Sequence, residues 1–201
     1  MDYSLIEFSQ LTDKDIKQLA VLHHSVMRTL LSDLGLPFVF KYYQIARADR
    51  TVLGFCARSA SGDLLGWAMG SPHPDRINAQ LRSPLAWFLL QMLRLTLTHP
   101  IVLWQLMSSV FLASRQLEVR RGTLELTYIG VAPSQRGRGL GNKLLEAFIE
   151  AGRSRGYKSV VLSVEKENLP AILLYEKTGF KVVDTFQEGH YRRHRMELAL
   201  A

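Results

Sequence analysis

The feature that most constrains this chain is a short glycine-rich, basic segment, Gln135-Arg136-Gly137-Arg138-Gly139-Leu140-Gly141-Asn142. It follows an apolar, strand-like run over residues 124–131 and leads into an amphipathic, helix-like run over residues 140–154. Glycines allow the backbone to turn sharply and to approach a ligand closely. The unpaired N–H groups of a helix's first turn, together with the positive end of the helix dipole, bind anions. The segment therefore predicts a strand, a turn and a helix that hold a phosphate group, with arginines beside it.

The rest of the chain supplies further strands and helices around this unit. Helical patterns begin near Thr12, Pro37, Gly139 and Asn168. Strand-like patterns cover residues 3–8, 51–58, 64–71, 123–131, 159–164, 180–186 and 191–199. Strands that alternate with crossover helices are typical of a mixed sheet with helices on both faces. We expect one α/β domain over residues 1–201, because this length suits a single domain and no repeat or low-complexity linker is present.

Composition narrows the classes of function. The formal net charge of +7 favours anionic ligands, but no nucleic-acid-binding motif is present and no nucleic-acid partner is expected. The single cysteine, Cys56, stands in an apolar run, which excludes a disulfide framework and predicts a core position. The first residues do not have the pattern of a secretory leader. We expect a cytoplasmic protein with no metal site.

Three phosphate-binding patterns compete for the glycine-rich segment. The P-loop, with Gly-Lys-Ser/Thr at its end, is absent, and so is the dinucleotide-binding pattern G-x-G-x-x-G with its later acidic residue. The pattern (Q/R)-x-x-G-x-(G/A) fits as Arg136-x-x-Gly139-x-Gly141. A second pattern, N-x-x-A-x-x-x-Y-x-x-x-G-F, fits residues 168–180. With both patterns present and in this order, the chain resembles the GNAT superfamily of N-acetyltransferases.

This resemblance implies both a fold and a cofactor site. The fold would be of GNAT type (acyl-CoA N-acyltransferase), a mixed central sheet flanked by helices, with its fourth and fifth strands separated around the cofactor. Acetyl-CoA would be the co-substrate, with its pyrophosphate on the glycine-rich segment. The implied cofactor-binding residues are Ile129, Val131, Arg136, Gly137, Arg138, Gly139, Leu140, Gly141 and Asn168. For Asn168 a plain helix N-cap is an equal alternative, and the two roles are compatible.

Acetyl transfer from a thioester to an amine needs a base for the amine and an acid for the departing thiolate. The resemblance implies that Tyr175, the motif tyrosine, is the acid, with core packing as the alternative. Glu125 matches the strand position where histone-type members carry a base glutamate, with a salt-bridge partner as the alternative. Ribosomal-protein N-terminal acetyltransferases carry a glutamate twelve residues before the motif tyrosine, where this chain has Ser163. His190 and His194 are weaker candidates for the base.

An apolar stretch interrupts the pattern between the third and fourth strands. Residues 74–121 contain two apolar runs, 85–95 and 101–112, which are each too short to span a bilayer. We expect a helical insertion that packs as a subdomain. An acceptor pocket, a membrane surface and a homodimer interface are the alternatives for its aromatic residues. These residues are Trp87, Phe88, Trp104 and Phe111. The basic run 190–195 is either a solvated hairpin or a site for an acidic substrate group.

The sequence therefore predicts an enzyme that transfers an acetyl group from acetyl-CoA to a primary amine by direct in-line attack. A small molecule or an amino sugar is the expected acceptor. One alternative is a protein or peptide N-terminal acetyltransferase, which the serine at position 163 disfavours. The other is a non-catalytic acyl-CoA-binding regulatory module, which would keep the phosphate site but would not need Tyr175.

Overall fold

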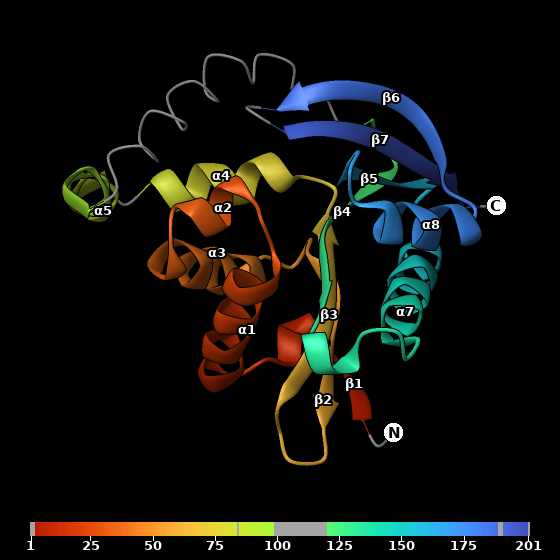
Figure 1. Ribbon diagram of the computed structural model, residues 1–201, viewed down its shortest axis with the longest axis horizontal. Helices are drawn as coiled ribbons and strands as arrows, with labels where there is room; N and C mark the ends of the chain where they lie inside the picture. Colours follow the sequence, from red (N-terminus) through yellow and green to blue (C-terminus); the bar gives the residue numbers. More distant parts are fainter. Residues whose placement is uncertain (1–2, 84, 99–119, 189–190, 201) are drawn as a thin grey trace.

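The computed structural model describes residues 3–83, 85–98, 120–188 and 191–200 (Figure 1). Its centre is a seven-stranded sheet with the order β1-β2-β3-β4-β5-β7-β6. The strands are β1 (Tyr3–Glu7), β2 (Leu53–Ser59), β3 (Leu64–Ser71), β4 (Thr123–Val131), β5 (Ser159–Glu165), β6 (Lys181–Glu188) and β7 (Tyr191–Ala199). Neighbouring strands are antiparallel except β4 and β5, which are parallel. The predicted α/β class with a mixed sheet is confirmed.

Helices cover both faces of this sheet (Figure 1). They are α1 (Asp13–Val26), α2 (Leu30–Asp33), α3 (Leu36–Ala48), α4 (Pro74–Arg82), α5 (Leu85–Thr98), α7 (Leu140–Ser154) and α8 (Leu169–Lys177), with 3-10 turns η1 (Phe8–Gln10) and η2 (Pro133–Gln135). We call the side covered by α1, α3 and α4 the α1–α3 face, and the side covered by α7 and α8 the α7–α8 face. Each face has its own apolar core, with Trp67 and Tyr43 in the first and Phe148 and Leu144 in the second. Cys56 is fully buried in the first core, as the sequence predicts.

The parallel strands β4 and β5 are paired over only part of their length. Their register runs from Thr123 opposite Ser159 to Leu126 opposite Leu162. Both strands continue beyond this pair, β4 to residue 131 and β5 to residue 165. The separation that the family resemblance implies is therefore present between these two strands.

A β-bulge marks the point where the two strands part. In the pairing of β3 with β4, Met69 lies opposite Tyr128, whereas the next residue, Gly70, lies opposite Leu126. Thr127 is thus the extra residue on β4. Bulges re-aim side chains and are frequent beside active sites. Beyond Thr127, β4 keeps its pairing with β3 and is open on the side of β5.

The N-terminal helices begin close to the predicted positions. Thr12 and Asp15 form a capping box at the start of α1, in which each side chain accepts a hydrogen bond from the other residue's N–H. The short helix α2 is an addition that the sequence pattern does not predict, because four residues are too few to show a helical period. It is capped by Thr29, whose hydroxyl accepts from the Ser32 N–H at 3.2 Å. Helix α3 then begins one residue before the predicted Pro37.

The predicted insertion begins as helices, since α4 and α5 follow β3. Trp87 and Phe88 of α5 pack edge-on against Phe38 of α3, with ring centroids 5.0 and 6.0 Å apart. These two aromatic residues pack against the core of the α1–α3 face. The second apolar run, with Trp104 and Phe111, lies outside the described residues. The extent of the insertion and its alternative roles stay predictions.

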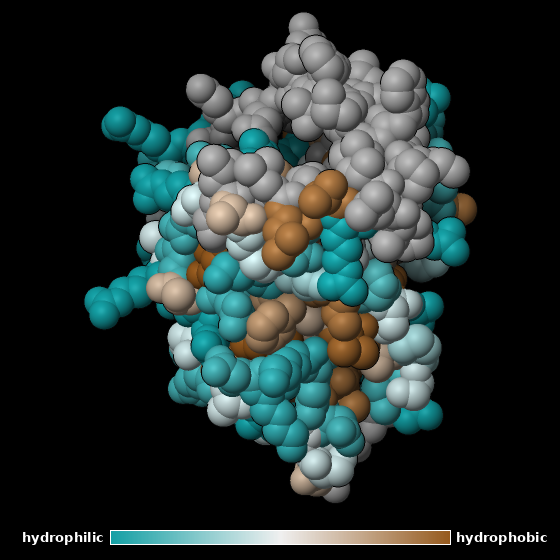
Figure 2. Space-filling model, turned by 90° about the vertical axis from the view of Figure 1, so that its left-hand side faces the viewer, coloured by the Kyte–Doolittle hydropathy of each residue, from teal (hydrophilic) through white to brown (hydrophobic). Residues whose placement is uncertain are grey.

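The helices that cover the α1–α3 face are partly apolar on the side that points away from the sheet. Figure 2 shows apolar side chains gathered near the middle of this side, among hydrophilic neighbours. Exposed apolar residues on α1, α3 and α5 include Val21, Leu36, Leu90 and Leu93. Of the helices that the structure describes, none is both long and apolar enough to cross a membrane.

Candidate active site

The glycine-rich segment forms the connection between β4 and α7. Gly137 and Gly139 have positive φ angles of 71° and 81°, which residues with a Cβ rarely adopt. Beyond the chain neighbours, no atom lies within 4 Å of where a Cβ would stand at either glycine. Gly139 is the N-cap of α7 and has no side chain to bond the first turn. The first amide N–H groups of α7 therefore remain open to an anion.

Two arginines flank this connection. Arg136 and Arg138 are exposed, and neither side chain forms a hydrogen bond or ion pair with a residue that the structure describes. Leu140, by contrast, is 2% exposed and packs in the core of the α7–α8 face. At Gly141 a Cβ would stand 3.7 Å from Leu174, an ordinary contact. Unpaired positive charge and open amide groups thus occur together, which fits a pyrophosphate.

The open side of β4 leads up to this connection. Ile129 and Val131 lie beyond the bulge, opposite Ala68 and Gly66 of β3. Their side chains are partly buried against the core of the α7–α8 face. Because the pairing with β5 ends at Leu126, none of the described strands pairs with the backbone of this stretch on that side. An extended ligand arm would find the hydrogen-bonding groups that an added strand uses.

Asn168 is the N-cap of α8. Its side-chain oxygen accepts a hydrogen bond from the Ala171 N–H at 3.3 Å. This contact satisfies one of the N–H groups that a helix leaves unpaired at its start. The helix-cap interpretation is confirmed, and the role of Asn168 as a cofactor ligand stays a prediction.

Tyr175 lies on α8 and is 6% exposed within the core of the α7–α8 face. Its ring packs on Phe180 with centroids 5.8 Å apart. Burial raises the pKa of the Tyr175 phenol above its usual value, so that the group keeps its proton at neutral pH. The hydroxyl forms no hydrogen bond with the described residues. Tyr175 thus packs in the core, and its phenol proton is not donated to any described residue. Its role as the acid stays a prediction.

Glu125 lies on the other face of the sheet. Leu124 and Leu126 point into the core of the α7–α8 face, so the side chain between them points to the α1–α3 face. There Arg195 Nη2, from β7, donates to Glu125 Oε2 at 2.9 Å. The side chains are 18% and 10% exposed, respectively. The salt-bridge alternative is therefore present in the structure, and the base role stays a prediction.

Arg195 is a residue whose place the sequence interpretation missed. It belongs to the basic run 190–195, for which the expectation was a solvated hairpin or a site for an acidic substrate group. Instead it is 8% exposed and pairs with a carboxylate of the protein itself. Its Nη1 also donates to Ser163 Oγ at 3.1 Å. The sequence gave no signal for this pairing, because alternation along β7 only places Arg195 on the face opposite to the buried Met196.

His23 is a second residue that the sequence interpretation did not single out. It is fully buried on α1, and its Nδ1 lies 2.7 Å from the hydroxyl of Tyr43 on α3. The imidazole also packs edge-on to Tyr128 of β4, with centroids 4.8 Å apart. Burial lowers the pKa of His23 to about 4, so the ring is neutral at pH 7. A signal was present, since His23 continues the apolar spacing of Ile16 and Leu19.

Two tyrosines lie close to Glu125 on the same face. Tyr42 of α3 and Tyr128 of β4 pack edge-on, with ring centroids 5.5 Å apart. Burial raises the pKa of Tyr42 well above its usual value, and the neighbouring Tyr128 and Glu125 raise it further. The Tyr42 phenol therefore keeps its proton beside the carboxylate.

The remaining histidine candidates are placed less centrally. His194 lies on β7, with its Nδ1 2.8 Å from the Thr185 hydroxyl on β6. His190 lies outside the described residues. In the part of the chain that the structure describes, no group of three His, Cys, Asp or Glu residues is placed to hold a metal ion.

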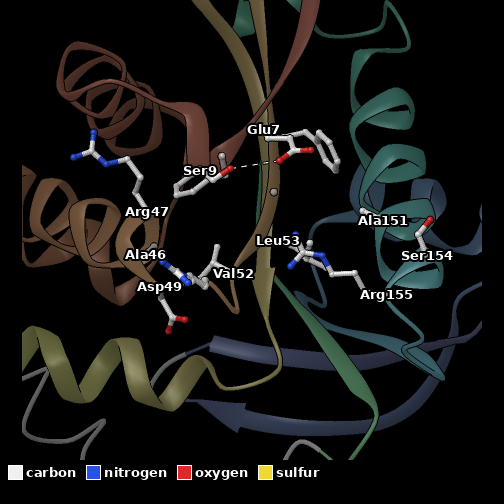
Figure 3. Close-up of a pocket in the computed structure, with 14 residues that line it drawn as sticks. Glu7, Ser9, Ala46, Arg47, Asp49, Val52, Leu53, Ala151, Ser154 and Arg155 are labelled. Atoms are coloured by element: carbon white, nitrogen blue, oxygen red, sulfur yellow. Dashed lines mark hydrogen bonds between the residues drawn. The ribbon is translucent and has the colours of Figure 1, made fainter.

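A cavity of about 360 Å³ lies away from these residues (Figure 3). It is formed where α3 and α7 end, beside η1 and the start of β2. Arg155 extends from the end of α7 toward Leu53, and Glu7 and Asp49 lie on other sides of the opening (Figure 3). The glycine-rich connection is at the opposite end of α7, about 22 Å away at 1.5 Å per residue. The cavity is therefore separate from the candidate active site.

A protein family and several known proteins resemble parts of this chain. A family model described as the acetyltransferase (GNAT) family matches residues 21–180. A mycothiol acetyltransferase of Saccharomonospora viridis is 44% identical over 61 residues, which are 30% of this chain and 20% of that protein. An L-methionine sulfoximine/L-methionine sulfone acetyltransferase of Pseudomonas aeruginosa is 40% identical over 68 residues, 34% of this chain and 39% of that protein. The chain thus matches between about a fifth and two fifths of these relatives' length.

Solved structures resemble nearly the whole chain. A putative acetyltransferase of the GNAT family from Desulfovibrio desulfuricans gives a TM-score of 0.65 at 15% identity and covers 99% of both chains. The ribosomal-protein-S18-alanine N-acetyltransferase from Escherichia coli gives a TM-score of 0.62 at 17% identity, over 99% of this chain and 94% of that one. At such low identities, the likeness establishes the fold alone.

Proposed function

Because the chain belongs to the acetyltransferase (GNAT) family, we propose that it transfers an acetyl group from acetyl-CoA to a primary amine by direct in-line attack. One observation carries this proposal. The uncapped, glycine-rich start of α7 and the open side of β4 adjoin, and together they offer unpaired positive charge and unpaired backbone groups. A phosphate-bearing molecule with an extended arm needs both.

Each part of acetyl-CoA has residues that fit it. When bound, acetyl-CoA would supply the acetyl group as a thioester. We assign its pyrophosphate to the amide groups at the start of α7 and to Arg136 and Arg138, which have no other partner among the described residues. The backbone of Ile129 and Val131 would pair with the pantetheine arm, and Asn168 would contact the arm from α8.

The two proposed catalytic residues lie on opposite faces of the sheet. Tyr175 belongs to the α7–α8 face, and Glu125 points to the α1–α3 face. Glu125 would accept the proton of the attacking amine, and Tyr175 would donate its phenol proton to the leaving group. The amine adds to the thioester carbonyl carbon, and the tetrahedral intermediate then expels the CoA thiolate. The base and the acid thus act on different groups and can come from different faces of the sheet.

For the acceptor, we propose a small molecule or an amino sugar. The matched relatives are named for mycothiol and for L-methionine sulfoximine, which supports a small acceptor. A peptide N-terminus is the alternative. It is disfavoured because Ser163, at the position of the glutamate in ribosomal-protein N-terminal acetyltransferases, here accepts a hydrogen bond from Arg195.

Calorimetric titration with acetyl-CoA tests the cofactor site. We expect a dissociation constant of about 1–100 μM for the unchanged chain. Arg136→Ala and Gly139→Asp should each weaken binding at least about tenfold, because they remove positive charge or place negative charge beside the phosphates. Gly62→Asp is the matched control, since Gly62 also has a positive φ and open surroundings but lies in the β2–β3 turn. Equal effects at Gly62 and Gly139, or no binding at all, would refute the cofactor site.

Tyr175→Phe separates an enzyme from a binding module. Release of the CoA thiol is followed with a panel of amines that contains L-methionine sulfoximine, an amino sugar and a peptide with an N-terminal alanine. For an enzyme, the variant should lose turnover by about 100-fold, the lower range for a general acid, while its acetyl-CoA affinity stays unchanged. Turnover that survives the substitution would rule out Tyr175 as the acid. Binding without turnover of any amine would favour the regulatory module.

A further inference from the structure

We infer that Arg195 is a positioning residue for the proposed transfer, and that it holds the Glu125 carboxylate where β4 and β5 separate. The inference rests on the proposed function, because it gives Arg195 a role in the reaction through Glu125. It assigns to Arg195 a different role from the recognition of an acidic substrate group.

The Arg195 side chain reaches across a whole strand. Arg195 lies on β7 opposite Ser163 of β5, and its Nη1 donates to the Ser163 hydroxyl at 3.1 Å. Its Nη2 donates to Glu125 Oε2 at 2.9 Å, on β4. Because neighbouring strands lie about 4.8 Å apart, the side chain must pass over β5 to make the second contact. One guanidinium thus connects β7, β5 and β4.

The contact with Glu125 lies at the end of the paired stretch. Glu125 is opposite Val161 within the β4–β5 pairing, whereas Ser163 is the first residue of β5 beyond it. On β4 the bulge residue Thr127 follows two positions after Glu125. Arg195 therefore bridges the two strands on the α1–α3 face next to the point where they part. A shift of either strand here would move the Glu125 carboxylate relative to the gap.

The chemistry of an arginine suits this task. A guanidinium is planar and directs several N–H donors in fixed directions, so it can hold a hydroxyl and a carboxylate at once. Arg195 is 8% exposed, and a charge removed from water in this way is stable only when it is paired. Among the described residues, Glu125 has no second ion-pair partner. Loss of Arg195 would therefore release the carboxylate and let it rotate.

Position matters for the rate, because misplacement of a reacting group by about 1 Å can cost about 100-fold. If Arg195 acts only by placing Glu125, its removal should cost nothing once the Glu125 carboxylate is gone. If the ion pair merely supports the fold, each substitution should lower the activity independently. A double-mutant cycle distinguishes these cases.

The cycle compares the unchanged chain with Arg195→Gln, Glu125→Gln and the double variant, using an amine from the panel above that the unchanged chain acetylates. The measured quantities are kcat, the KM for acetyl-CoA, calorimetric acetyl-CoA affinity and the thermal midpoint. Arg153→Gln is the matched control, because Arg153 also pairs with a glutamate, Glu150, at 2.7 Å but does so on the exposed side of α7. Arg195→Lys tests whether kcat is partly rescued, since lysine keeps the positive charge but lacks the planar guanidinium with its several donors.

We expect Glu125→Gln to lower kcat by about 100-fold and Arg195→Gln by about 10-fold to 100-fold. The double variant should be no slower than Glu125→Gln alone. Acetyl-CoA affinity and its KM should stay within about twofold, because the cofactor site lies elsewhere, and Arg195→Lys should recover part of the lost kcat. Arg153→Gln should change none of these quantities.

Losses that multiply in the double variant, or an Arg195→Gln variant with an unchanged kcat, would overturn the inference and leave the proposed function standing. A chain that binds acetyl-CoA but acetylates no amine of the panel would overturn both. If the Arg195→Gln variant does not fold, the comparison between Arg195→Lys and the unchanged chain still decides, because the proposal requires a lower kcat with an unchanged acetyl-CoA affinity.

Discussion

The two faces of the sheet carry candidate site residues of different origin. On the α7–α8 face, the glycine-rich connection, Asn168 and Tyr175 all fall within residues 136–180 and are placed by neighbouring elements. On the α1–α3 face, Glu125 and Arg195 are 70 positions apart and meet only because the sheet places β5 between their strands. A short motif can therefore identify one half of such a site, whereas the other half depends on the folded sheet.

The faces also differ in how their polar groups are paired. Near the start of α7, arginines and amide groups lack partners among the described residues, as expected where a ligand supplies the partner. On the α1–α3 face, Arg195 pairs with Glu125, and the buried His23 contacts the Tyr43 hydroxyl. One face is thus open to an anion, and the other holds its polar groups in place before any ligand binds. The following substitutions test that contrast.

The largest effect is expected at Gly70, because both faces depend on the β3–β4 pairing. A Cβ at this position would overlap the backbone carbonyl of Glu125 and lie 2.8 Å from the ring of Phe148. The overlapping group belongs to the backbone and cannot rotate away as a side chain could. Gly70→Ala should therefore lower the free energy of unfolding by about 4 kcal/mol or more. Urea unfolding measures this, with Gly141→Ala as control, because a Cβ there makes ordinary contacts. A loss below about 1 kcal/mol would contradict the described packing of β3 on β4.

A smaller effect, confined to the α1–α3 face, should depend on pH through His23. Burial lowers its folded pKa to about 4, below the ordinary 6.5, so below pH 6.5 the unfolded chain binds more protons. The contribution of neutral His23 to the free energy of unfolding is complete above pH 6.5. It is lost as the pH falls toward 4, by about 3 kcal/mol in all. Unfolding free energies at pH 7 and 4.5 should therefore differ less in His23→Gln than in the unchanged chain. His73→Gln, at an exposed position before α4, should keep the full difference, because His73 does not contribute to the pKa shift of His23.

The smallest effect is expected at Asn168 on the α7–α8 face. Asn168→Ala removes the N-cap of α8 and should cost about 1 kcal/mol of stability, whereas Asn168→Asp keeps a capping oxygen and should cost almost nothing. If Asn168 also contacts the cofactor, Asn168→Asp should still weaken acetyl-CoA binding. Thermal unfolding and calorimetry on the same two variants separate the roles. Equal stability of both variants would mean that the cap contributes nothing.

The order of elements was predictable because each strand and helix is visible in a local pattern. The mixed sheet, the helix cap at Asn168 and the buried Cys56 all follow from periods and capping residues within a few positions. The ion pair of Arg195 was not predictable in this way, because a basic run gives no indication of which of its members turns inward. The short helix α2 was missed for lack of length. The predicted roles of Tyr175 and of the cofactor residues await the experiments above.

The bulge on β4 changes which residues of that strand share a face of the sheet. In a regular strand, residues of equal parity share a face, so Leu124 and Leu126 would be followed by position 128. The extra residue at Thr127 reverses the parity, and the apolar side passes to Ile129 and Val131 while Tyr128 turns to His23. The sequence of β4 already shows this change, because its apolar residues stand at even positions before Thr127 and at odd positions after it. Deleting Thr127 would remove the bulge and leave one regular alternation along the strand, in which Ile129 and Val131 keep the face that they occupy now.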